Sequence, residues 1–381
     1  MQYRSFGSFD FEASALGFGC MRLPTIGDDP AKIDEPAATA MLRHAIDQGV
    51  NYIDTAYPYH GGMSEVVVGR ALKDGYRERV KLVTKLPLWM VENVEDVDRL
   101  LNEQLERLDD GFIDIYLVHN ICRSLWPIVE KCRVLERLEA AKAAGKIGQI
   151  GFSFHDCYDL FAEVVDSYDG WALAQIQYNY ANETMQAGTK GLEYAASKGL
   201  ATVIMEPLLG GCLVTPPPSV AEALLDAPVK KRAPVEWALQ WLWNKPEVGV
   251  VLSGMGEMCQ VEENLSYADA SGVGMLTEAE LAVVARAAEA HAGVNAIPCT
   301  SCRYCMPCPH GVDIPHNFNL FNGVTTFGGN QVVLNPIIYS LLPEESRASG
   351  CVGCKVCEER CPQGIEISAW MPKVHEELGA S

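Results

Sequence analysis

Residues 51–65 read NYIDTAYPYHGGMSE, a stretch in which an apolar segment gives way to polar residues. An apolar run ends here at an acid, Asp54. Tyr59 follows five residues later among Gly, Pro and His, a composition that suits a loop better than a helix or strand. The stretch therefore predicts a buried strand that delivers polar groups at its end.

Short apolar runs of this kind recur along the chain and alternate with amphipathic segments such as Ala40–Gln48 and Val94–Leu108. The runs are continuously apolar, as strands of a parallel sheet covered on both faces must be. Eight such units in about 240 residues predict an α/β protein built on a closed (β/α)8 TIM barrel. The predicted strands are Ala15–Cys20, Val50–Asp54, Val80–Lys85, Ile113–His119, Ile147–Ser153, Ala172–Gln177, Ala201–Met205 and Val248–Ser253.

An open, doubly wound sheet is the competing fold. It would place a G-x-G-x-x-G phosphate loop after the first strand. Here Gly17 and Gly19 lie within the first run itself, and Cys20-Met21-Arg22 follows it. The sequence therefore favours the barrel.

Polar residues gather where the predicted strands end. In a barrel of this kind the chemistry lies at the C-terminal ends of the strands. Apolar runs have no structural need to end in polar groups, so these residues together predict an active-site mouth. They are Asp54, Tyr59, Lys85, His119 and Ser153, with Gln175 inside the sixth run.

Four of these residues describe proton delivery to a carbonyl group. Tyrosine has a pKa near 10, so Tyr59 needs a neighbouring cation before it exchanges a proton at neutral pH. Lys85 can supply that cation, and Asp54 can hold Lys85 charged. His119 can donate a hydrogen bond to the carbonyl oxygen. The set has no hydride source of its own, so a nicotinamide cofactor is implied.

The sequence up to about residue 270 resembles the aldo-keto reductase family. The resemblance rests on DTAYPY at 54–59, Ser64-Glu65, GRAL at 69–72, VTK at 83–85 and DIYLVHN at 114–120. It implies that Tyr59 is the general acid, that Lys85 lowers the pKa of Tyr59, that Asp54 pairs with Lys85, and that His119 orients the carbonyl.

The resemblance also implies the cofactor contacts. Ser153 and Gln175 match the residues that hold the nicotinamide carboxamide, whereas Phe154 and Met205 replace the usual Asn and stacking Tyr. The adenosine-phosphate loop is matched at Ser253, Gly254, Gln260, Glu263 and Asn264. Because Gln260 stands where the family has an Arg for the 2′-phosphate, charge complementarity leans toward NADH over NADPH, or toward weak cofactor binding.

A second domain is expected after the change of composition near residue 294. The predicted boundaries are 1–293 for the barrel and 294–381 for the second domain. The second domain contains two cysteine runs, C-x2-C-x2-C-x2-C-P and C-x2-C-x2-C-x3-C-P. The second run has the bacterial ferredoxin spacing, in which three thiolates hold one [4Fe-4S] cluster and the fourth reaches the other cluster.

This spacing predicts two [4Fe-4S] clusters, and helical segments between the runs, Pro315–Phe321 and Pro336–Leu342, predict a mainly helical dicluster ferredoxin domain. One cluster would be held by Cys299, Cys302, Cys305 and Cys361, and the other by Cys351, Cys354, Cys357 and Cys308. The first run is one residue shorter than the ferredoxin pattern before its Pro. Structural zinc is the alternative, but zinc sites take their ligands in two separated pairs. Both domains together resemble the ferredoxin-containing branch of the aldo-keto reductases.

Composition restricts the partners and the compartment. With 50 acidic and 30 basic residues, the net charge of −20 repels nucleic acid and anionic membranes. The N-terminal stretch lacks a secretion signal, and no apolar run of about 18 residues exists to span a membrane. Thiols stay reduced in the cytosol, and eight of the fourteen cysteines are in the two runs. The protein is therefore expected to be cytoplasmic.

Two functions remain open at the level of sequence. The first is an NAD(P)H-linked oxidoreductase that interconverts a small-molecule carbonyl and an alcohol, with the clusters exchanging electrons with a redox partner protein. The second is an iron-sulfur electron-transfer or redox-sensing protein whose barrel mainly binds a partner or has lost nicotinamide chemistry. The second function is supported by Phe154 and Met205, which replace usual nicotinamide contacts, and by the lack of the residues that bind a 2′-phosphate in the family.

Overall fold

Eight parallel strands close into a barrel, in which the last strand pairs with both the seventh and the first. The computed structural model describes residues 1–27, 29–225, 229–291, 297–327 and 331–379. The predicted fold class is confirmed, and each predicted run overlaps one barrel strand. The strands are β3 (Leu16–Gly19), β4 (Tyr52–Asp54), β5 (Lys81–Pro87), β6 (Ile113–Ile121), β7 (Ile147–Phe154), β8 (Trp171–Gln177), β9 (Ala201–Met205) and β10 (Val250–Gly254).

Helices separate the strands along the chain. Gly49, Gly145 and Gly199 end three of them with φ values of +99°, +72° and +77°, the left-handed conformation that glycine adopts without strain. The helices are α1 (Glu35–Asp47), α2 (Met63–Ala71), α3 (Val94–Leu108), α4 (Trp126–Lys131), α5 (Val134–Ala143), α6 (Tyr158–Asp166), α7 (Gly188–Ser197), α8 (Pro218–Leu225), α9 (Pro234–Trp243), α10 (Met258–Asp269) and α11 (Glu278–His291).

A short N-terminal hairpin, which the sequence did not predict, closes the N-terminal end of the barrel. Its strands are β1 (Tyr3–Ser5) and β2 (Glu12–Ser14), paired antiparallel. Phe6, in the turn, belongs to the barrel's interior core and lies edge-on to Tyr52, with ring centroids 5.7 Å apart. The hairpin thus fills the end of the barrel opposite the strand ends that carry the polar residues.

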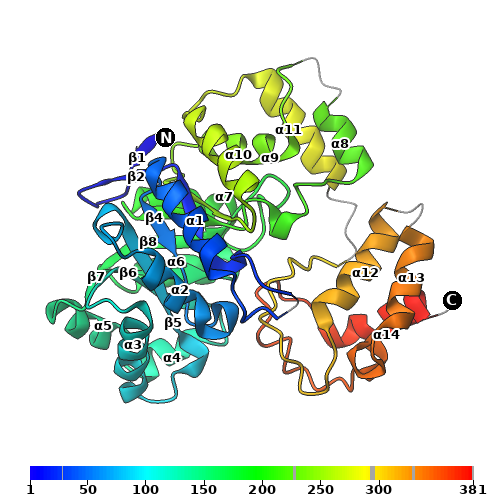
Figure 1. The fold of residues 1–381 in the computed structure, drawn as a ribbon, viewed down its shortest axis with the longest axis horizontal. Helices are drawn as coiled ribbons and strands as arrows, with labels where there is room; N and C mark the ends of the chain where they lie inside the picture. The colour runs from blue at the N-terminus through cyan, green and yellow to red at the C-terminus, as the bar shows by residue number, and fades with distance from the viewer. Residues whose placement is uncertain (28, 226–228, 292–296, 328–330, 380–381) are drawn as a thin grey trace. The chain divides into compact units, whose positions relative to one another are not determined.

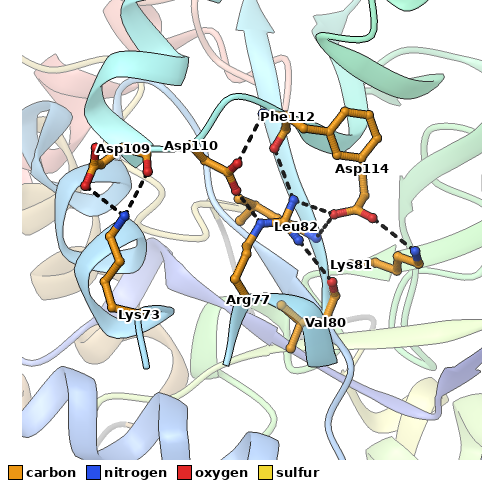
Figure 2. Close-up of polar contacts among 9 residues, drawn as sticks. All are labelled: Lys73, Arg77, Val80, Lys81, Leu82, Asp109, Asp110, Phe112 and Asp114. Atoms are coloured by element: carbon orange, nitrogen blue, oxygen red, sulfur yellow. Dashed lines mark hydrogen bonds and ion pairs between the residues drawn. The ribbon is translucent and has the colours of Figure 1, made fainter. Parts of the chain in front are cut away.

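Ion pairs fix the starts of β5 and β6 at this same N-terminal end (Figure 2). Asp114 of β6 accepts hydrogen bonds from the Leu82 amide at 3.1 Å and the Lys81 ammonium at 3.0 Å. Arg77, in the 3-10 turn before β5, reaches Asp114 at 2.8 Å and also pairs with Asp110. These bonds cross from one strand to the next, so they oppose a shift in strand register.

The chain divides into two compact units, Met1–Pro207 with Ala238–Thr277, and Leu208–Trp237 with Glu278–Ser381. The second unit therefore includes the segment after β9 as well as the C-terminal part of the chain. The predicted boundary between residues 293 and 294 lies outside the described residues, and it stays a prediction.

The C-terminal part of the second unit is helical, as predicted, and has its own apolar core. The core includes Ile314, Phe318, Tyr339, Met371 and Val374. Its helices are α12 (Ile314–Phe327), α13 (Gln331–Leu341) and α14 (Ile367–Gly379) (Figure 1). In the part of the chain that the structure describes, no helix has the length and hydropathy that crossing a bilayer requires.

Candidate functional site

Strand alternation carries polar side chains to the mouth of the barrel. The interior core includes Tyr52, Val83, Leu117 and Leu173. Two positions further along the same strands stand Asp54, Lys85, His119 and Gln175. Since successive strand residues point to opposite faces, these four point to the same side as the core residues before them. They reach the C-terminal end of the barrel, where enzymes of this architecture hold their active sites.

Lys85 is the centre of the group. Its ammonium donates to Asp54 Oδ1 at 2.6 Å, to the carbonyl oxygen of Thr55 at 2.9 Å and to the Tyr59 hydroxyl at 3.4 Å. Lys85 is only 1% exposed and Asp54 only 2%. A buried ammonium is costly unless it is paired, and these three oxygens satisfy its three donors.

Tyr59 is presented by a turn rather than by a strand. It opens the 3-10 turn Tyr59–Gly62, within which His60 and Gly61 have left-handed φ values of +53° and +63°. His60 is held there by the Pro30 carbonyl at 2.7 Å and the Leu23 amide at 3.1 Å. This change in chain direction places the Tyr59 phenol over Lys85 rather than leaving it in solvent.

His119 completes the set as a neutral imidazole. Burial lowers the pKa of His119 well below its usual range, and the charge of Lys85 lowers it further. Its ring lies edge-on to Tyr59, with centroids 6.3 Å apart, and 5.0 Å from the ring of Trp89. Burial also raises the pKa of Asp54, which Lys85 and Gln175 partly offset. The structure thus brings the four predicted catalytic residues together.

Buried polar contacts behind the mouth explain the Ser64-Glu65 motif. Ser64 Oγ lies 2.8 Å from Thr55 Oγ1, beside the carbonyl that Lys85 contacts. Glu65 accepts from Thr84 Oγ1 and Gln104 Nε2, both at 2.6 Å. Gln104 also donates to the Lys85 carbonyl at 3.0 Å. Gln104 could not be identified from the sequence, because only its buried partners distinguish it from other polar residues of α3.

The residues expected to hold the nicotinamide lie on neighbouring strands. Ser153 and Gln175 are register partners across β7 and β8. Ser153 Oγ accepts a hydrogen bond from the backbone N–H of Asn120 at 2.8 Å, which leaves the Ser153 hydroxyl proton free to be donated to a ligand. Gln175 Oε1 is buried and has no partner among the described residues. An acceptor and a donor on adjacent strands fit a carboxamide. Met205 ends β9 and is partly exposed.

The expected adenosine-phosphate loop links β10 to α10. Asn264 Nδ2 donates to Ser253 Oγ at 3.0 Å, and Gln260 Oε1 accepts the Gly256 amide at 2.9 Å. Glu263 is exposed. A Cβ placed on Gly254 would lie 3.4 Å from the side chain of Arg22. Arg22, a cation beside this loop, could not be identified from the sequence, because it comes from the far end of the barrel sequence.

The eight predicted cluster cysteines line two hollows in the second unit. One hollow is lined by Cys299, Cys302, Cys305 and Cys361, and the other by Cys308, Cys351, Cys354 and Cys357. Each hollow therefore takes three thiols from one run and one from the other, which is the grouping predicted from the spacing. No disulfide joins any of the fourteen cysteines, all of which lie in the described part of the chain. Among the described residues, no three Cys, His, Asp or Glu side chains converge at single-ion distance.

Residues with a left-handed backbone conformation interrupt both cysteine runs and turn the chain around each hollow. Ser301 and Arg303 have φ values of +55° and +64°, and Gly353 and Lys355 have +72° and +63°. Each stands between two cysteines of its run, so the backbone winds around the hollow. Burial raises the pKa of Cys299 and of Cys357 to about 11. These thiols must release protons when they bind a metal.

Comparison with known proteins matches both parts of the chain. Residues 15–280 match the Aldo/keto reductase family, and residues 298–366 match a 4Fe-4S dicluster domain. L-galactose dehydrogenase of Arabidopsis thaliana is 29% identical over 289 residues, which are 70% of this chain and 88% of that protein.

Two further relatives are matched over shorter stretches. Aldo-keto reductase YhdN of Bacillus subtilis is 32% identical over 56% of this chain and 64% of its own. Probable aldo-keto reductase 1 of Glycine max is 34% identical over 39% of this chain, and the chain covers only 43% of that relative.

Solved structures agree with the fold. Aldo-keto reductase AKR11C1 from Bacillus halodurans, in its holo form, superposes with a TM-score of 0.62 at 25% identity, over 76% of this chain and 97% of its own. The thermostable aldo-keto reductase Tm1743 superposes with a TM-score of 0.63 at 24% identity, over 75% of this chain and 100% of its own.

The family match and the matched relatives, together with the closed barrel, make this chain an NAD(P)-dependent oxidoreductase. The chain belongs to the aldo/keto reductase family and carries a C-terminal 4Fe-4S dicluster ferredoxin domain. Both predicted resemblances are confirmed.

Proposed function

We propose that this enzyme interconverts a small-molecule carbonyl and an alcohol by hydride transfer, with Tyr59 as the general acid and base. The observation that carries the proposal is the position of the Lys85 ammonium, 2.6 Å from Asp54 Oδ1 and 3.4 Å from the Tyr59 hydroxyl. A cation at this distance stabilises a phenolate, and the carboxylate holds the cation in place through a buried ion pair. The relative named L-galactose dehydrogenase supports alcohol and carbonyl chemistry.

In this mechanism each of the four residues has one task. In the direction of reduction, Tyr59 donates its proton to the carbonyl oxygen as negative charge develops there. His119, neutral because burial depresses its pKa, hydrogen-bonds that oxygen and orients it. Lys85 stabilises the resulting phenolate, and Asp54 holds Lys85 in place. The nicotinamide, when bound, supplies the hydride.

The proposed cofactor contacts run along one side of the mouth. Ser153 and Gln175 would hold the carboxamide of a bound nicotinamide, with Met205 as the residue next to its ring. The loop of Ser253, Gly254, Gln260, Glu263 and Asn264 would bind the phosphates, with Arg22 as the neighbouring cation. Because Gln260 offers no charge to a 2′-phosphate, NADH is the proposed preference.

The proposal for the second domain is two [4Fe-4S] clusters. Cys299, Cys302, Cys305 and Cys361 hold the first, and Cys308, Cys351, Cys354 and Cys357 hold the second, as the lining of the two hollows supports. Such clusters carry single electrons. We therefore propose that they exchange electrons with a redox partner protein.

Substitution of the proposed general acid tests the mechanism. Tyr59→Phe removes the phenolic proton and keeps the ring, so kcat for nicotinamide-dependent carbonyl reduction should fall by about 10²–10⁴-fold. Binding of NADH, followed by its fluorescence, should be retained.

Tyr57→Phe is the matched control, because the Tyr57 hydroxyl donates instead to Glu103 at 2.9 Å, on α3. Its kcat should stay within about twofold of the unmodified enzyme. Full activity in Tyr59→Phe would refute the assigned mechanism.

A further inference from the structure

Three more polar side chains stand at the mouth, and neither the tetrad nor the expected carboxamide contacts use them. They are Asn120 from β6, His155 directly after β7, and Gln177 at the end of β8. All are buried, with exposures of 5%, 9% and 0%. Asn120 Oδ1, His155 Nδ1 and both amide atoms of Gln177 have no hydrogen-bond partner among the described residues.

Their strands turn these side chains toward the mouth. On β8, Leu173 lies in the interior core and Gln175 lies beside Asp54, so Gln177 is the next residue on the same face. His155 stands two residues after Ser153, and the charge of Lys85 contributes to depressing its pKa. Both residues therefore extend the polar lining one layer beyond the tetrad.

Asn120 reaches the mouth through an irregularity in β6. The register between β6 and β7 shifts between Val118 and Ile121, and Asn120 has a left-handed φ of +62°. A bulge of this kind puts two consecutive residues on one face and recurs next to active sites. Here the bulge lets Asn120 follow His119 into the mouth, and the strained conformation at Asn120 is a typical feature of a functional site.

This three-residue wall is neutral and offers both donors and acceptors. Burial lowers the pKa of His155 to about 4, so its imidazole is uncharged at neutral pH. Asn120 and Gln177 carry amides, and the charges of Asp54 and Lys85 compensate each other. Four buried polar atoms without partners are costly unless a ligand completes them. One carboxamide, already matched to Ser153 and Gln175, is too small to satisfy all of them.

The chemical group that fits such a wall is the hydroxyl, which both donates and accepts. Trp89 adds an apolar surface beside His119, with ring centroids 5.0 Å apart, and is itself half-buried. An aromatic face next to amides and an imidazole suits a chain that has C–H groups on one side and hydroxyls on the other.

We propose that Asn120, His155 and Gln177 bind hydroxyl groups of a neutral polyhydroxylated substrate, an aldose or the corresponding alditol, and thereby determine specificity. This rests on the proposed function, because it assumes that the mouth is the active site. A site built to hydrogen-bond a substrate hydroxyl strongly rejects the analogue that lacks it.

Equilibrium binding to the full-length protein, purified anaerobically, tests the proposal. The probes are xylitol and 1-pentanol, which share a five-carbon chain, and calorimetry or saturation-transfer NMR measures their dissociation constants. Xylitol should bind at least about tenfold more tightly than 1-pentanol. Gln177→Leu, which keeps nearly the same size and removes both amide atoms, should weaken xylitol binding about tenfold without weakening 1-pentanol binding.

Two further variants serve as a second test at the mouth and as a control. Asn120→Gly tolerates the left-handed φ and removes the side chain, so it decides the question if Gln177→Leu fails to fold. Gln48→Leu, at an exposed position after α1, is the matched control and should bind xylitol like the unmodified protein. Equal affinity for the two probes, or unchanged xylitol binding in both mouth variants, would overturn the proposal.

Turnover on the same preparations separates this proposal from the proposed function. Xylitol binding without reduction of any carbonyl by NADH or NADPH would sink the proposed function alone. Carbonyl reduction without preferential xylitol binding would sink the specificity assignment alone.

Discussion

Lys85 connects the other residues of the mouth, because its ammonium contacts the Asp54 carboxylate, the Thr55 carbonyl and the Tyr59 hydroxyl at once. Burial makes each of these contacts strong, since little water competes for them. The same burial keeps His119 and His155 neutral. The mouth therefore combines one compensated ion pair, Asp54 with Lys85, with two neutral imidazoles.

Neutral His155 should make stability depend on pH. Burial lowers the pKa of His155 from the ordinary 6.5 of an imidazole side chain to about 4 in the folded protein. Below pH 6.5 the unfolded chain therefore binds a proton that the folded chain does not, and stability falls as the pH falls toward 4. At 1.36 kcal/mol per pKa unit, the loss attributable to His155 is about 3 kcal/mol.

His155→Gln removes this titration. The difference in unfolding free energy between the two proteins should be flat above pH 7 and should narrow between pH 6.5 and 4, as followed by denaturant unfolding. A difference that stays constant over that window would contradict a neutral, buried His155.

Coenzyme preference should respond to position 260. Gln260 Oε1 accepts the Gly256 amide and has no charge to offer a 2′-phosphate. Gln260→Arg supplies a bidentate cation, so the ratio of kcat/KM for NADPH to that for NADH should rise about tenfold. Gln48→Arg, which adds the same charge away from the loop, should leave the ratio unchanged. A ratio that does not move would place the 2′-phosphate elsewhere.

At the scale of elements, the N-terminal end of the barrel supports the register that the mouth needs. Asp114 is the common acceptor for Arg77, Lys81 and the Leu82 amide, and its side chain is only 10% exposed (Figure 2). Residues at this end of a barrel contribute to stability rather than to chemistry.

Asp114→Asn should therefore destabilise the protein by about 2 kcal/mol, because Arg77 and Lys81 lose a buried charged partner. Unfolding midpoints in denaturant measure this change. Asp109→Asn is the control, since Asp109 pairs with Lys73 but is 80% exposed, and little change is expected. Equal effects of the two substitutions would show that burial does not decide the strength of these pairs.

The barrel strands were predictable because continuous apolar runs such as Ala201–Met205 form only where both faces of a strand are covered. The N-terminal hairpin was not predictable, since strands of three residues carry no periodic signal. The proposed catalytic residues were identified from strand ends and from the family's motifs. Gln104, Arg22 and Asn120 were not, because burial, long-range approach and a bulge appear only in the folded chain.

At the scale of the whole molecule, the barrel and the ferredoxin domain each contain one half of the proposed redox chemistry. The cysteine runs are predictable from spacing alone, because a cluster needs fixed thiol positions. The assignment of Leu208–Trp237 to the second unit was not predictable, since it depends on contacts between segments far apart in the sequence.

The proposed clusters each take three thiolates from one cysteine run and one from the other, and this arrangement can be tested by the iron content of cysteine variants. Two cubanes give about eight irons per chain. Cys302→Ser and Cys361→Ser alter the same hollow from different runs, so each should reduce the iron count to about four, and the double variant should reduce it no further. Iron and acid-labile sulfide are measured on anaerobic protein. A double variant that loses nearly all its iron would show that each run holds its own cluster.

Deuterium transfer tests the central claim, that the barrel moves a hydride between a nicotinamide and a carbonyl. The anaerobic enzyme is incubated with NADH or NADPH deuterated at C4 on either face, together with D-xylose, and the alcohol product is analysed by mass spectrometry. Deuterium from one face of the nicotinamide is expected on the former carbonyl carbon, and Tyr59→Phe should abolish this product. Oxidation of the coenzyme with no deuterium in any carbonyl-derived product would contradict it.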